Sequence, residues 1–121
     1  MITRLIGISG NVDVDKLAQD YDKLLAPEEA IHAGFQVLRD LIIFTSKRII
    51  MIDVQGFTGR KREYLSIPYG KITKFSIESS GHLDLEADLK IWVGSDLTPI
   101  EKKFNRKTNI YDVQRIMATF V

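Results

Sequence analysis

The sequence predicts a mainly β fold: a seven-stranded, antiparallel, partly open barrel or sandwich, capped by a C-terminal helix and carrying an extra N-terminal helix. Three observations predict it. Apolar residues recur at helical spacing near both ends of the chain, they alternate with polar residues in between, and turn residues separate the alternating runs. A length of 121 residues fits one domain, so residues 1–121 are expected to form a single unit.

Residues 13–25 are predicted to form the first helix, because apolar residues recur every four positions on one side. Asp13 or Asn11 is the expected N-cap. Pro27 ends the helix, since the residue before a proline disfavours helical geometry. The apolar stripe consists of Leu17, Tyr21 and Leu25, with Val14, Ala18 and Leu24 beside them.

Residues 28–106 change to a period of two, which is typical of strands with one buried face. The glycine-punctuated segment 55–59 is expected to be a hairpin loop. The expected strands are 31–37, 41–45, 49–54, 63–67, 72–78, 83–93 and 100–106.

Residues 109–121 return to helical spacing, with the helix expected over 110–120. Asn109 is a good N-cap, and Asp112 lies favourably in the first turn. We expect the apolar stripe of this helix to close an open end of the barrel. Its members are Val113, Ile116, Met117 and Phe120.

Two segments resemble the bacterial pleckstrin-homology (PH-like) family. Residues 41–53 (LIIFTSKRIIMID) are similar to its apolar hairpin, and residues 66–75 (SIPYGKITKF) to its isoleucine-proline, turn and isoleucine segment. The resemblance covers residues 27–121. It implies a non-catalytic binding scaffold without a cofactor, and a small protein that assembles into rings.

Eukaryotic relatives of that family often bind phosphoinositide headgroups through basic residues on the first two strands and the loop between them. Here the loop is Leu38-Arg39-Asp40, in which one acid offsets one base, so the sequence departs from the lipid-binding pattern.

Composition excludes several classes of protein. The chain has no cysteine, which excludes disulfides, thiolate catalysis and cysteine-ligated metal sites. Its 17 basic and 16 acidic residues argue against nucleic-acid binding. No apolar run approaches the ~20 residues that cross a bilayer, and residues 1–10 are too interrupted for a signal peptide. We therefore expect a cytoplasmic protein.

Charge is unevenly distributed along this nearly neutral chain. Residues 47–74 hold seven basic and two acidic residues, whereas residues 78–101 hold one basic and six acidic residues. Two interpretations stay open: cross-strand pairing within the chain, or head-to-tail packing of identical subunits in which the basic side of one meets the acidic side of the next.

Apolar residues in 42–44 and 49–52 face both sides of their strands, so something must cover the outer face. The first helix is one candidate cover and a second subunit is the other. Trp92 interrupts an otherwise polar strand face. It is expected either to contact a partner or to pack against the first helix. The predicted oligomer or partner interface comprises Phe44, Ile50, Ile52, Trp92 and Tyr21.

The loop at 56–62 combines two glycines, Phe57 and three basic residues. It is a hairpin turn with solubilising charge or, alternatively, a site for a phosphate or an anionic surface. The predicted anion-binding residues are Arg60, Lys61, Arg62, Lys102 and Lys103.

No catalytic, cofactor-binding or metal-binding residue is predicted. His32 and His82 have neither a neighbouring nucleophile nor metal-ligand spacing. The acidic row at Asp84, Glu86 and Asp88 is interpreted as a solvated face or as partners of basic neighbours, with a small hydrolase as the least favoured option.

Together these features predict a non-catalytic scaffold that self-assembles into a homo-oligomeric ring, with a pentamer as one option, and presents a surface to an unidentified protein or peptide. The alternative is binding of an anionic lipid or phosphate ligand through residues 59–62. No nucleic-acid partner is expected.

Overall fold

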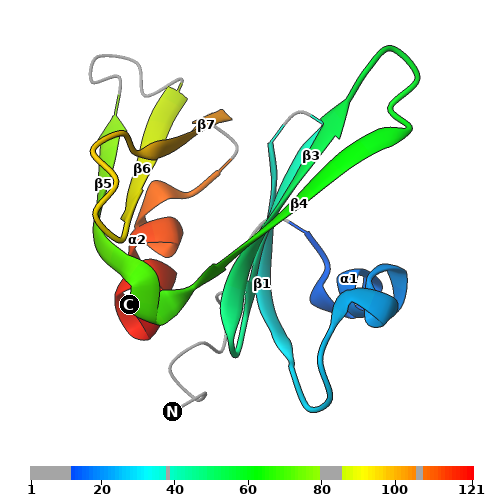
Figure 1. The fold of residues 1–121 in the computed structure, drawn as a ribbon. Helices are drawn as coiled ribbons and strands as arrows, with labels where there is room; N and C mark the ends of the chain where they lie inside the picture. The colour runs from blue at the N-terminus through cyan, green and yellow to red at the C-terminus, as the bar shows by residue number, and fades with distance from the viewer. Residues whose placement is uncertain (1–11, 38, 80–85, 106–107) are drawn as a thin grey trace.

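The computed structural model describes residues 12–37, 39–79, 86–105 and 108–121. A short N-terminal helical segment precedes seven strands, and an eleven-residue helix ends the chain (Figure 1). The elements are α1 (Val14–Asp20), η2 (Asp22–Leu24), β1 (Ile31–Val37), β2 (Asp40–Thr45), β3 (Arg48–Gln55), β4 (Lys61–Pro68), η3 (Tyr69–Lys71), β5 (Ile72–Ser79), β6 (Glu86–Val93), β7 (Ile100–Asn105) and α2 (Ile110–Phe120).

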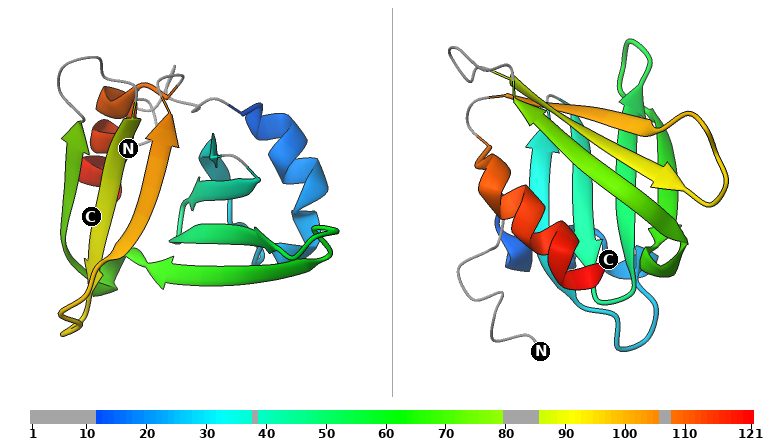
Figure 2. Two further views of the ribbon diagram at one scale, coloured as in Figure 1. Left: turned by 90° about the horizontal axis from the view of Figure 1, so that it is seen from above. Right: turned by 90° about the vertical axis from the view of Figure 1, so that its left-hand side faces the viewer.

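The strands form two antiparallel sheets, which confirms the predicted mainly β fold. The first sheet has the order β1-β2-β3-β4 and the second the order β5-β6-β7. Both are simple meanders, because every hydrogen-bonded neighbour is also the next strand in sequence. Figure 2 shows the two sheets meeting at an angle, with α2 lying against the second sheet and α1 on the far side of the first.

The main core lies between the sheets. Phe35 packs edge-on against Phe44 and Phe104, with ring centroids 5.9 and 6.0 Å apart. The buried face of α2 joins this core through Val113, Ile116 and Met117, as the sequence predicts. Asn109 caps α2 by accepting hydrogen bonds from the amides of Tyr111 and Asp112.

A second core lies on the outer face of the first sheet, where the N-terminal helix covers the strands that are apolar on both faces. On β3, Ile49 and Met51 point into the main core, while Ile50 and Ile52 point to the opposite face. Leu17 of α1 is buried against that opposite face. The N-terminal helix therefore packs on its own barrel.

Contact between α1 and the sheet is close because Gly34 on β1 has no side chain. A Cβ atom built there would lie 2.2 Å from Leu17 Cδ1. The glycine thus lets the helix approach the sheet at the point where Leu17 is inserted.

Several predicted boundaries need correction. The helix expected over 13–25 ends at Asp20, and a separate 3-10 turn, η2, follows after Tyr21 leaves helical geometry. This break lets Leu24 and Leu25 also reach the outer core. Strand β4 is longer than the predicted 63–67, because its outermost residues also pair with β3. Both faces of this strand are largely exposed, so alternation of apolar and polar residues does not mark its ends. Residues 83–85 and Arg106 lie outside the described residues.

Among the described residues, no helix is long and apolar enough to cross a membrane.

Candidate binding surface

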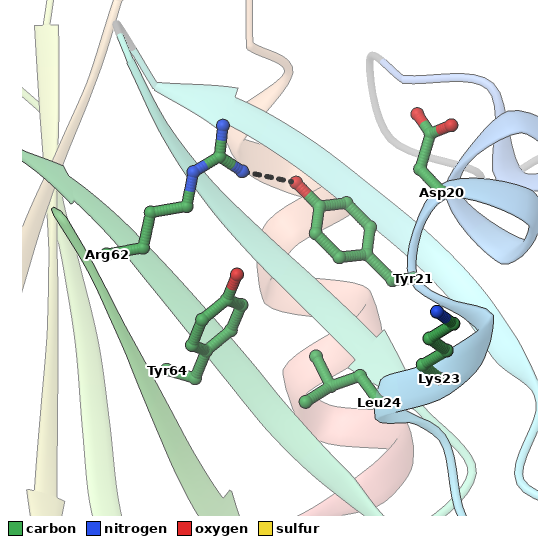
Figure 3. A pocket seen from close by; sticks show the side chains of 6 residues that line it. All are labelled: Asp20, Tyr21, Lys23, Leu24, Arg62 and Tyr64. Atoms are coloured by element: carbon green, nitrogen blue, oxygen red, sulfur yellow. Dashed lines mark hydrogen bonds between the residues drawn. The ribbon is translucent and has the colours of Figure 1, made fainter. Parts of the chain in front are cut away.

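A shallow pocket opens between the N-terminal helical segment and β4. It has a volume of about 340 Å³ (Figure 3). Arg62 and Tyr64 come from β4, opposite Val54 and Ile52 of β3, and so lie on the face that α1 covers. Six residues line the pocket: Asp20, Tyr21, Lys23, Leu24, Arg62 and Tyr64.

The pocket walls combine apolar groups, the cations of Lys23 and Arg62, and one carboxylate, that of Asp20, which lies 3.5 Å from Lys16 Nζ. Leu24 and the ring of Tyr64, which is 48% exposed, supply apolar surface. Arg62 Nη1 lies 3.5 Å from Tyr21 Oη, a long contact that leaves most of the guanidinium donors available. Such a pocket suits an apolar side chain accompanied by a negative charge.

The hairpin between β3 and β4 projects beyond the rest of the first sheet (Figure 1). Phe57 is fully exposed at its tip, and Gly56 and Gly59 take positive φ angles of 79° and 71°. Arg60 and Lys61 are exposed and form no ion pair with any carboxylate in the described part of the chain. The tip therefore carries unneutralised positive charge.

The structure divides the predicted anion-binding set into two groups. Lys102 Nζ bonds to Asp53 Oδ1 across the space between the sheets, and Lys103 Nζ lies 3.4 Å from Asp88 Oδ1. These two lysines are neutralised on β7, away from the hairpin tip that carries Arg60 and Lys61. Only the 60–62 part of the prediction remains a candidate cationic surface.

Cross-strand charge pairing occurs, but within the second sheet. Lys90 of β6 lies 3.8 Å from Glu101 of β7, beside the pair between Lys103 and Asp88. Asp88 is thus a partner of a basic neighbour, which was one of the two interpretations of the acidic row, while Asp84 and the side chain of Glu86 lie outside the described residues.

Three residues of the predicted interface need correction. Phe44 lies in the main core, and Ile50 and Ile52 lie in the outer core beneath α1; all three are fully buried. They offer no surface to a partner, because α1 of the same chain covers Ile50 and Ile52, and Phe44 is enclosed in the main core. Periodicity alone could not tell an intramolecular cover from a second subunit.

The two aromatic residues of that set remain partly accessible. Tyr21 lines the pocket. Trp92 is half-buried, with Lys74 Nζ 4.5 Å above its ring centroid, and α1 lies against the other sheet. The alternative that Trp92 packs on the first helix is therefore wrong.

Sequence reasoning missed Tyr64, Leu24 and Leu97 as surface groups. Leu97 is 93% exposed in the turn that joins β6 to β7. An apolar residue within the polar run 94–99 is the only signal that could have drawn attention to it.

The loop between β1 and β2 is used for internal contacts. Arg39 Nη2 donates to the carbonyl of Gly56 at 2.8 Å, and Asp40 Oδ1 accepts from the amide of Val54. Both charged side chains of this loop are thus engaged with the neighbouring hairpin, which agrees with its departure from the lipid-binding pattern.

Glu29 is the one buried carboxylate among the described residues. Burial raises the pKa of Glu29, but hydrogen bonds from Arg48, Thr45 and the amide of Ala26 outweigh it and lower the pKa to about 2. Tyr69 lies nearby, and burial together with the negative charge of Glu29 raises the pKa of its phenol. A carboxylate held so firmly in its charged form is unsuited to act as a general acid or base near neutral pH.

His32 stacks on Phe120 with ring centroids 5.4 Å apart, and burial lowers the pKa of its imidazole. His82 lies outside the described residues. In the described part of the chain no three histidine, aspartate or glutamate side chains gather to hold a metal ion.

Several known proteins are similar to this chain in sequence and in fold. A family model described as "Bacterial PH domain" matches residues 1–121. The uncharacterized protein YjqA of Bacillus subtilis (strain 168) is 40% identical over 118 residues, covering 97% of this chain and 94% of that protein.

Two solved structures share the fold closely. A protein with a pleckstrin-homology domain from Shewanella loihica PV-4 superposes with a TM-score of 0.83 at 37% sequence identity, covering 93% of this chain and 95% of that one. A pleckstrin homology domain from Shewanella amazonensis SB2B gives a TM-score of 0.83 at 38% identity, covering 98% of this chain and 96% of that one.

Proposed function

Because the chain belongs to the bacterial PH domain family, we propose that it is a non-catalytic binding scaffold that self-assembles head to tail into a homo-oligomeric ring. A second part of this proposal is that the ring presents a surface to a protein or peptide partner in the cytoplasm.

One observation carries the proposal: the cations at 60–62 have no carboxylate partner in the described part of the chain, while an open pocket lies beside them. Unneutralised charge beside a partly apolar pocket is typical of a surface that another protein completes. The doubly apolar strands do not support self-assembly, because α1 covers their outer face.

The free edges of the two sheets support a surface for a peptide. Strand β4 pairs only with β3, and β5 only with β6, among the described strands. Each spans eight residues and is mostly exposed. An extended peptide can add to such an edge through main-chain hydrogen bonds.

The test is light scattering coupled to size exclusion, over a range of protein concentrations. The proposal predicts a particle of several times 13.8 kDa that persists on dilution to micromolar concentration. A monodisperse 13.8 kDa species at that concentration would contradict self-assembly.

Exposure of Phe57 beside Arg60 and Lys61 favours a second candidate function, binding to an anionic lipid surface. Basic residues near such a surface attract it, and an exposed ring can enter the interface. Flotation with phosphatidylserine vesicles at low and moderate salt tests this candidate. It predicts co-flotation that salt weakens and that the double variant Arg60→Glu/Lys61→Glu abolishes. Absence of flotation at low salt would exclude it.

A further inference from the structure

We infer that the pocket between η2 and β4 binds the β6–β7 turn of a second copy of this chain, with Leu97 entering beside Leu24 and Asp96 facing Arg62. The inference rests on the proposed self-assembly and names the contact that makes it.

The turn at 94–99 is fixed in shape. The amide of Gly94 donates to the carbonyl of Lys71 at 2.8 Å, and the amide of Asp96 donates to the carbonyl of Val93 at 3.1 Å. Gly94 has φ 58°, a conformation that favours glycine. A turn that is already ordered loses little conformational freedom when it binds.

The side chains of Leu97 and Asp96 have no partner among the described residues of their own chain. Leu97 is 93% exposed. Asp96 is exposed and forms no ion pair with the described residues. The turn thus presents an apolar side chain next to a free negative charge, on an otherwise polar loop.

The pocket has the complementary chemistry. Leu24 and the rings of Tyr21 and Tyr64 can contact an apolar side chain, while Arg62 and Lys23 carry positive charge at its rim. Among the described residues, the side chain of Arg62 has only a long contact to Tyr21, so little must be broken for it to meet a carboxylate. Apolar packing with a charge pair at the rim is a common arrangement at protein interfaces.

The two surfaces lie on opposite sides of the molecule. In Figure 1 the pocket side, next to α1, is on the right, and the turn between β6 and β7 is on the left; the left panel of Figure 2 shows the same separation. One copy therefore cannot fill its own pocket. Unlike surfaces that join copy to copy generate a closed ring when the rotation between subunits closes.

Two single variants and their mixture test the contact. Arg62→Glu removes the cation of the pocket, and Leu97→Asp removes the apolar group of the turn. We expect each variant alone to lose the large particle and elute with the 13.8 kDa mass of one chain. An equimolar mixture retains one intact pocket and one intact turn, so it should form a dimer that grows no further.

A charge exchange and a matched control sharpen the result. The double variant Arg62→Glu/Asp96→Arg should recover assembly, because each contact then pairs opposite charges again. Tyr111→Asp changes an exposed aromatic residue on α2, outside the contact, and its particle mass should equal that of the wild type. Far-ultraviolet circular dichroism checks that each variant is folded.

Failure of this inference and failure of the proposed function give different results. If the wild type assembles and both Arg62→Glu and Leu97→Asp keep its mass, the contact is wrong while self-assembly stands. If the wild type is a monomer, both are overturned. If folded variants lose assembly but their mixture gives no dimer, the pairing of this turn with this pocket is wrong.

Discussion

Arg48 holds Glu29 in a two-pronged ion pair: Nε lies 2.9 Å from Oε2, and Nη2 lies 3.1 Å from Oε1. The same guanidinium donates to the carbonyl of Leu24 and to Ser66 Oγ, each at 2.8 Å. One side chain on β3 thus ties together η2, the segment before β1, and β4. These contacts fix the position of the helical segment that forms one wall of the pocket.

Replacement of Glu29 by glutamine should lower the free energy of unfolding by about 2 kcal/mol, because hydrogen bonds to a charged partner are lost and Arg48 is left uncompensated. Urea denaturation at pH 7 measures this. Glu63→Gln is the matched control, since Glu63 is exposed on β4 and its replacement should change stability by less than about 0.5 kcal/mol. Equal stabilities of the two variants would contradict the structural role of Glu29.

The pH dependence of stability should carry the signature of the same carboxylate. The folded-state pKa of Glu29 is lowered from 4.5 to about 2, so the unfolded state binds a proton more readily. The stabilisation is complete above pH 4.5 and is lost as the pH falls toward 2. Urea denaturation at a series of pH values between 4.5 and 2 should show that the free energy of unfolding falls more steeply for the wild type than for Glu29→Gln. Parallel curves would show that Glu29 has no lowered pKa.

Leu17 tests whether α1 belongs to its own barrel. Leu17→Ala should lower the free energy of unfolding by about 2–5 kcal/mol, because the side chain is buried in the outer core. Lys16→Ala, one residue earlier on the same helix and exposed, should have an effect of less than about 0.5 kcal/mol. Both variants are measured by denaturation in a chain that also carries Leu97→Asp, which is expected to prevent assembly. If Leu17→Ala and Lys16→Ala then have the same free energy of unfolding, Leu17 of α1 is not buried against the first sheet.

The cap of α2 offers a smaller effect. Asn109→Ala should cost about 1 kcal/mol, since Asn109 Oδ1 accepts from the amide of Tyr111 at 2.9 Å and from that of Asp112 at 3.4 Å. Gln114→Ala, exposed on the same helix, is the control. Thermal unfolding followed by circular dichroism compares the two, and a Gln114 variant that is as unstable as the Asn109 variant would rule out a specific cap.

His32 should titrate below 6.5, because burial against Phe120 disfavours the imidazolium. Its contribution to stability is therefore present above pH 6.5 and decreases as the pH falls below that value. Nuclear magnetic resonance titration of the imidazole protons measures the pKa, and Phe120→Ala should move it upward. A wild-type pKa at or above the ordinary value would contradict the stacked arrangement.

The sequence predicts the fold well because local patterns determine most of it. Apolar spacing over 110–120 and Asn109 as cap predict α2 at its observed bounds. Alternation predicts six of the seven strands to within two residues at each end, and residues 83–85 of the seventh, β6, lie outside the described residues. The largest difference is at the start of β4, which begins at Lys61 and not at Glu63. That strand is a sheet edge with both faces largely exposed, so it has no clear hydrophobic period.

The candidate surface was only partly predictable. The sequence indicates Arg62 and Tyr21 as candidate residues, but their contact depends on the turn η2 and on the pairing of β3 with β4, which are tertiary features. Phe44, Ile50 and Ile52 were assigned to an interface because apolar runs on both faces of a strand do not reveal what covers them. The neutralisation of Lys102 by Asp53 links residues far apart in the chain and left no sequence signal.

Native mass spectrometry of the wild-type chain tests the central claim, head-to-tail closure into a ring, most directly. We expect one dominant species at a fixed integer multiple of the 13.8 kDa chain, unchanged over a tenfold range of concentration, because a closed ring has no free end. A ladder of successive multiples would indicate open chains, and a spectrum of 13.8 kDa monomer alone would contradict self-assembly altogether.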